Sequence, residues 1–139
     1  MCLRGASEVS KTLVKITAHR DLPSYVVWVP MLGGQETHVP KATRVVVDER
    51  AKHYWDGSGL LVSGYQQALS LPVPAWDIYM VYGPEARWDD GAPSSPVFWM
   101  HQLNSSVEGP WLDAAVFGER VMALLDNQRG TRSKTDDTP

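Results

Sequence analysis

The sequence predicts an α/β domain in which a mixed β-sheet is flanked by helices on both faces. Helical and strand patterns alternate over the first part of the chain, which is typical of parallel strands joined by helical crossovers. Two strand patterns then follow each other directly, which adds an antiparallel edge to the sheet. With 139 residues, 43% of them apolar, the chain is long enough for one domain with a single core.

Three segments show the apolar spacing of an amphipathic helix. In residues 6–18, Val9, Leu13 and Ile16 recur at intervals of four and three. The same spacing recurs in residues 58–69, and near the carboxy terminus it is carried by Ala114, Phe117, Val121, Leu124 and Leu125. Residues 40–46 are ambiguous, because Pro40 suits the first turn of a helix whereas the valines that follow favour a strand. We predict a short helix there.

Strand patterns fill the spaces between these helices. Residues 25–31 form a compact β-branched and aromatic run between turn signals, which predicts a buried strand. Residues 52–55 predict a short strand that ends at the Asp56-Gly57 turn. Residues 76–82 and 96–103 predict the antiparallel pair, with a longish loop rich in Gly, Pro, Ser and Asp between them.

Composition sets the limits of the domain and of its function. Residues 1–126 form the predicted domain, and the polar residues 127–139 a disordered tail. A net charge of −3 argues against nucleic acid as a partner. The longest apolar runs are far shorter than the roughly 20 residues that span a bilayer, so no membrane partner is expected. One cysteine and the absence of a secretion signal predict a cytoplasmic location.

Cys2-Leu3-Arg4-Gly5 opens a helix, Val73-Pro74 precedes a strand, and a hairpin and a final helix follow. This combination resembles the thioredoxin-like fold, and within it the redoxin and thiol–disulfide oxidoreductase branch. In that family a strand leads into a C-x-x-C motif at a helix amino terminus, and a cis-proline before a later strand lies against the thiols. The resemblance implies that Cys2 is a catalytic thiol and that Pro74, in the cis form, positions the substrate.

The motif is incomplete, because Cys2 is the only cysteine. It lies directly before the helical pattern, where the second, resolving cysteine of the family falls. The resemblance therefore implies a domain truncated at its amino terminus, without the first cysteine and the central strand that precedes it. Without a second thiol, a mixed disulfide has no internal partner to resolve it, so dithiol cycling is impossible in this chain.

The chemistry expected at Cys2 follows from its place before a helix. The positive end of the helix dipole stabilises a thiolate, and Arg4 adds to this effect if its side chain folds back toward the sulfur. We predict an oxidoreductase-related protein with an incomplete redox centre and no cofactor. Its partner would be a protein or a small thiol or disulfide, bound at Arg4, Pro74 and Trp76.

The sequence also allows a second interpretation. A non-catalytic binding module of the same fold would hold a partner on the aromatic surface of Trp76, Tyr79 and Trp88. No metal site is predicted, because the closest pair of metal-binding residues, His53 and Asp56, has no matching second pair. Phosphate-binding loops and nucleophilic-serine motifs are absent from the sequence as well.

Overall fold

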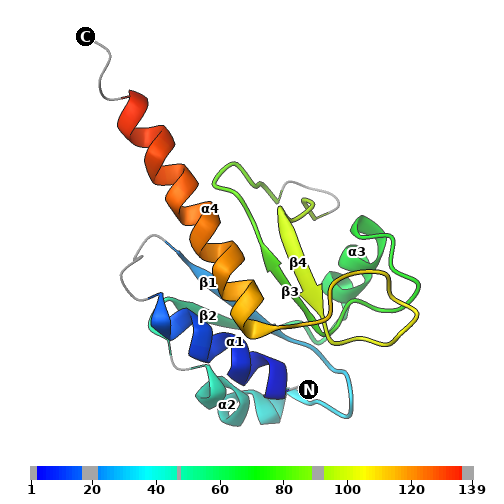
Figure 1. Ribbon diagram of the computed structural model, residues 1–139. Helices are drawn as coiled ribbons and strands as arrows, with labels where there is room; N and C mark the ends of the chain where they lie inside the picture. Colours follow the sequence, from blue (N-terminus) through cyan, green and yellow to red (C-terminus); the bar gives the residue numbers. More distant parts are fainter. Residues whose placement is uncertain (1–2, 17–21, 47, 89–92, 136–139) are drawn as a thin grey trace.

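A computed structural model describes residues 3–16, 22–46, 48–88 and 93–135, and side chains as far as Asn127. It shows an α/β protein with four α-helices and two small sheets, as drawn in Figure 1. The α-helices are α1 (Leu3–Lys15), α2 (Val39–Ala42), α3 (Leu60–Ala68) and α4 (Ala114–Thr135). The strands are β1 (Ser24–Trp28), β2 (Ala51–Trp55), β3 (Ile78–Val81) and β4 (Phe98–His101).

The first sheet is a parallel pair. β1 and β2 run side by side from Ser24 opposite Ala51 to Trp28 opposite Trp55. A parallel pair needs a crossover, and here it contains α2 between two short 3-10 turns, η1 (Glu36–His38) and η2 (Thr43–Val45). The prediction of a short helix at residues 40–46 is therefore confirmed, although only part of it is α-helical.

The second sheet is the predicted antiparallel pair. Ile78 lies opposite His101 and Val81 opposite Phe98. Beyond β4 a single bridge joins His101 to Trp111. In this bridge the His101 N–H donates to the Pro110 carbonyl, and His101 accepts from the Leu112 N–H. The free edge of β4 is thus partly covered by backbone from the segment that leads into α4.

Alternating side chains divide the core between the two faces of β3 and β4. Successive residues of a strand point to opposite faces. Val81 and Met100 belong to one cluster with Ile16, which follows α1, and with Phe117 and Val121 of α4, and Val9 of α1 packs against it. Their strand neighbours Ile78, Met80 and Trp99 pack against the other cluster, which contains Tyr65, Leu71, Ala75, Leu103 and Val107. Helices therefore cover both faces, α1 and α4 on one and α3 on the other.

The sequence predicts one mixed sheet, and this is wrong for the part of the chain that the structure describes. β1 pairs only with β2, and β3 pairs only with β4. Local residue patterns identify which segments are extended, but the pairing of distant strands depends on tertiary packing. No described strand joins the free edges of β1 and β3. The α/β class is confirmed, and the thioredoxin-like arrangement of the sheet is not.

The last helix is longer than the sequence predicts. α4 continues through residues 127–135, which composition assigns to a disordered tail. A helix that is already nucleated adds residues at little cost, and this segment holds good helix formers such as Gln128, Arg129 and Lys134. Composition alone does not show that residues 127–135 continue a helix whose earlier turns are packed against the domain.

Asp56 fixes the start of α3. Its carboxylate accepts hydrogen bonds from the backbone N–H groups of Ser58, Gly59 and Leu61 at 2.8–3.1 Å and from the Ser58 hydroxyl. Burial acts to raise the pKa of Asp56, but these hydrogen bonds outweigh it and hold the pKa below 3.8. The carboxylate therefore supplies the acceptor that the first turn of the helix needs.

We expect Asp56→Ala to lower the free energy of unfolding by about 1–2 kcal/mol, because these donors lose their acceptor. The folded pKa lies below the unfolded value of 3.8, so this contribution is complete above pH 3.8 and is lost as the pH falls through the folded pKa. Urea unfolding at pH 7 and at pH 3 measures both effects. Ser58→Ala is the matched control and should cost less, since it removes one donor. An equal loss for the two variants would contradict this role.

Candidate functional site

The structure describes three of the four residues that the resemblance implies for the redox site. Cys2 lies outside the described residues, and α1 begins at the residue after it. Arg4, in the first turn, is exposed. Pro74 is also exposed and its peptide bond is trans, like every peptide bond that the structure describes. The cis-proline that the resemblance implies is therefore not found.

The first turn of α1 packs closely on the second sheet. A Cβ atom added to the buried Gly5 would lie 2.7 Å from Cζ of Tyr79, and nearer still to the Tyr79 hydroxyl and the Gln102 side-chain oxygen. Real side chains do not approach so closely, so only glycine fits this contact. The start of α1 is thereby held against β3 and the residue that follows β4.

A buried acid, Asp77, holds the Tyr79 side chain that contacts Gly5. Asp77 is only 5% exposed, and its carboxylate accepts a hydrogen bond of 2.8 Å from the Tyr79 hydroxyl. Its backbone carbonyl accepts the N–H of Gln102 at 2.9 Å. The Tyr79 ring meets Phe117 of α4 edge-on, with ring centres 6.5 Å apart. Together these contacts fix the orientation of the tyrosine beside the helix start.

Sequence reasoning missed the part that Gly5, Asp77 and Gln102 play in this site. For Asp77 the sequence does contain a signal. It stands inside the apolar strand pattern of residues 76–82, and a carboxylate in such a place needs a hydrogen-bond partner. Tyr79, two residues further on, points to the same face of a strand and is the natural partner.

A shallow cavity of about 330 Å³ also reaches the start of α1. Its lining consists of Leu3, Leu32, Gly33, Gly34, His38, Lys41 and Ala42. Leu32 and Gly33 both have positive φ, 51° and 71°, and Leu32 is 70% exposed. A bulky residue is uncommon in this conformation, so the turn holds an exposed leucine beside the helix start under backbone strain.

The aromatic surface predicted for a binding module is not formed. Trp76 is half-buried in the cluster around Tyr65, whereas Tyr79 packs against the cluster of α1 and α4. Trp88 is 54% exposed, but its indole N–H donates to the Tyr65 hydroxyl at 3.0 Å. Burial and the hydrogen bond from Tyr82 to Tyr65 raise the pKa of Tyr82 far above its usual value of 10.0. These rings support the fold on different faces of the sheet.

Among the described residues, no three histidine, cysteine or acidic side chains lie together as a metal site would require. No helix in the same part of the chain is long and apolar enough to cross a membrane. Comparison with family models, with curated proteins and with solved structures gave no match. The fold and the site thus define an α/β protein in which a helix start, a buried acid and a tyrosine meet at one end of the second sheet.

Proposed function

We propose that this chain is a thioredoxin-like domain that takes part in thiol–disulfide exchange, with Cys2 as the reacting thiol of an incomplete redox centre. Its partner is a protein or a small thiol or disulfide in the cytoplasm. We propose that three residues of this chain contact the partner, namely Arg4, Pro74 and Trp76. No cofactor is needed, because the exchange passes electrons between sulfur atoms.

One observation carries the proposal, namely the contact between the first turn of α1 and the start of β3. Gly5 lies against Tyr79, and the buried Asp77 bonded to Tyr79 follows Pro74 by three residues. The beginning of α1 therefore lies against the end of the second sheet that the chain enters from the loop containing Pro74.

The order of the elements adds support. After α1 come a crossover between parallel strands, a helix, an antiparallel pair and a last helix that packs against α1. A thiolate at the start of α1 would attack one sulfur of a partner disulfide, and the other sulfur would leave with the electron pair and take up a proton. Since this chain has one cysteine, the mixed disulfide would persist until an external thiol released it.

The pH dependence of the Cys2 thiol tests the proposal. We expect the midpoint of the Cys2 thiol titration to lie below about pH 8.5, because the positive end of α1 stabilises the thiolate. The rate of alkylation is measured from pH 5 to pH 10, about the range in which a cysteine thiol titrates. The same chain unfolded in urea is the reference, and Cys2→Ser is the blank. A folded midpoint equal to or above the unfolded one would contradict the proposal.

Reaction with a small aromatic disulfide gives a second measurement on the same chain. The folded chain should form one mixed disulfide faster than the urea-unfolded chain at pH 7, and mass spectrometry should show it unchanged until an external thiol is added. Arg4→Ala should slow this reaction, whereas Arg44→Ala, which also removes an exposed arginine, should not. Equal rates for the folded and unfolded chains would remove the support for a reactive thiol.

A further inference from the structure

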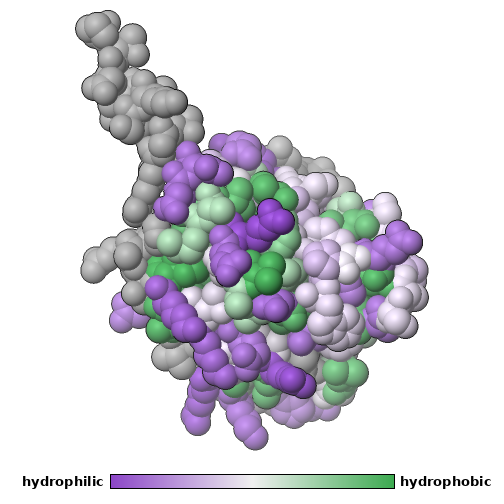
Figure 2. All heavy atoms as spheres, in the orientation of Figure 1, coloured by the Kyte–Doolittle hydropathy of each residue, from purple (hydrophilic) through white to green (hydrophobic). Residues whose placement is uncertain are grey.

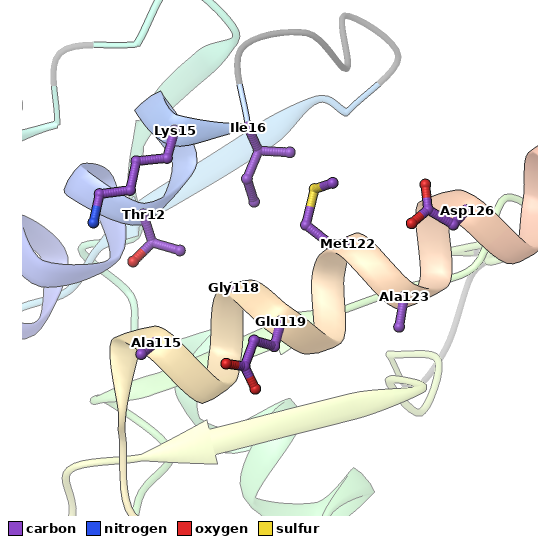
Figure 3. Close-up of a pocket in the computed structure, with 9 residues that line it drawn as sticks. All are labelled: Thr12, Lys15, Ile16, Ala115, Gly118, Glu119, Met122, Ala123 and Asp126. Carbon is purple, nitrogen blue, oxygen red and sulfur yellow. The ribbon is translucent and has the colours of Figure 1, made fainter.

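A groove between α1 and α4 lies away from the helix start described above. It has a volume of about 530 Å³, and Figure 3 shows the residues that line it. Ile16, the residue after α1, and Met122 of α4 point toward one another across its floor. At the closed side, the Thr12 hydroxyl donates to the Ala114 carbonyl at 3.0 Å, and Gly118 allows Thr12 to lie close to α4.

The two walls of the groove carry opposite charges. The wall formed by α1 bears Lys15, and the wall formed by α4 bears Glu119 and Asp126. Lys15 and Glu119 are exposed, and the only described ion pairs are Lys11 with Glu8 and Arg50 with Asp48. In a two-fold dimer each wall meets the opposite wall of the second copy. A surface with one positive and one negative wall is therefore complementary to itself.

The outer side of α4 offers apolar contact beside these charges. Ala115 and Ala123 line the groove and are exposed, and Val116 is 40% exposed on the same stretch of helix. Small side chains let a second helix approach closely. Figure 2 shows apolar and charged side chains side by side on the face that α4 crosses. An interface of this kind combines an apolar centre with charged residues at the rim.

The length of α4 points to a helical partner. The second half of the helix extends away from the other described elements in Figure 1. Helices in water owe most of their stability to tertiary packing, so turns of a continuous helix that lack such packing gain stability from a partner. A second α4 laid along the first would supply that packing over the extending turns.

From these observations we infer that the groove between α1 and α4 is the interface of a homodimer, in which α4 of one copy packs along α4 of the other. Lys15 of each protomer then lies against the acidic wall formed by Glu119 and Asp126 in the second copy. This inference does not depend on Cys2 or on the proposed exchange reaction.

Sedimentation equilibrium on the intact chain tests the interface. We expect a monomer–dimer equilibrium with a dissociation constant between about 1 µM and 1 mM. Ala123→Arg should weaken the dimer by about tenfold or more, because it places a long charged side chain at the contact. Ser105→Arg, at an exposed loop position, is the matched control and should leave the equilibrium unchanged. A chain that stays monomeric at about 1 mM would overturn the inference, and so would a dimer that tolerates Ala123→Arg.

Charge exchange separates this interface from other modes of association. Glu119→Lys places a positive charge on the α4 wall opposite Lys15 of the second copy and should weaken the dimer by about tenfold. Combining it with Lys15→Glu exchanges the charges of Lys15 and Glu119 and should restore the dimer to within about threefold of the parent chain. Circular dichroism confirms that each variant is folded before its association is measured. Failure of the double variant to recover, while it remains folded, would overturn the inference.

Discussion

Replacing Gly5 by alanine should destabilise this protein, although alanine is the better helix former. In a free helix the change would stabilise by about 1 kcal/mol. In the folded chain the new Cβ would lie 2.7 Å from Cζ of Tyr79, and the ring cannot withdraw, because its hydroxyl is bonded to the buried Asp77. Overpacking of this kind costs about 1–3 kcal/mol. We expect a net loss of up to about 2 kcal/mol in the free energy of unfolding.

Urea unfolding of three variants separates the clash from the helix propensity. Ser7→Ala, in the same helix and half-buried, is the control and should change stability by less than about 0.5 kcal/mol. In a Tyr79→Phe background the loss caused by Gly5→Ala should shrink, since the nearest oxygen is gone. If Gly5→Ala stabilises the protein, α1 does not pack on β3 as described. Independently of that result, the Cys2 titration repeated on Gly5→Ala shows whether this contact also affects the titration midpoint of the thiol.

The local structure of this chain could be read from its sequence because it depends on short-range periodicity. The amphipathic spacing in residues 6–18 gave α1, and the alternation in residues 76–82 gave β3, each within a few residues of its bounds. Pro40 at the start of a helical turn correctly indicated α2. These signals need only neighbouring residues, so no knowledge of the tertiary fold was required.

The arrangement of the strands could not be read in the same way. Which strand pairs with which depends on contacts between distant residues, and the two separate sheets have no local signature. The candidate site shows the same limit. Gly5 looked like part of a motif around Cys2, whereas its buried contact with Tyr79 joins residues that are far apart in the sequence. The family resemblance implies a cis peptide bond before Pro74, whereas this bond is trans in the structure.

Arg50 joins the end of α1 to the start of β2, and its removal should have the largest effect on stability. Its guanidinium donates to both carboxylate oxygens of Asp48, at 2.9 and 2.6 Å, and to the carbonyls of Leu13 at 2.8 Å and Ile16 at 3.3 Å. The Asp48 side chain is only 7% exposed and that of Arg50 16%. The hydrogen bond from Arg50 lowers the pKa of Asp48, despite burial, and Asp48 raises that of Arg50.

We expect Arg50→Gln to cost about 3 kcal/mol, because it leaves a buried carboxylate without its cation and removes the guanidinium donors from the carbonyls of Leu13 and Ile16. Arg50→Lys keeps the charge but lacks the planar fork, so its cost should lie between those of the parent chain and Arg50→Gln. Adding Asp48→Asn to Arg50→Gln should recover part of the loss, since the unpaired charge is removed. Urea unfolding at pH 7 measures all three variants.

The dependence on pH gives an independent check of this ion pair. The folded pKa of Asp48 lies below its unfolded value of 3.8, so the pair contributes fully above pH 3.8 and is lost as the pH falls through the folded value. The difference in stability between the parent chain and Arg50→Gln should therefore be constant from pH 6 to 8 and shrink below pH 3.8. If that difference is the same at pH 3 as at pH 7, the loss comes from the carbonyls of α1 alone, and Asp48 does not contribute to it.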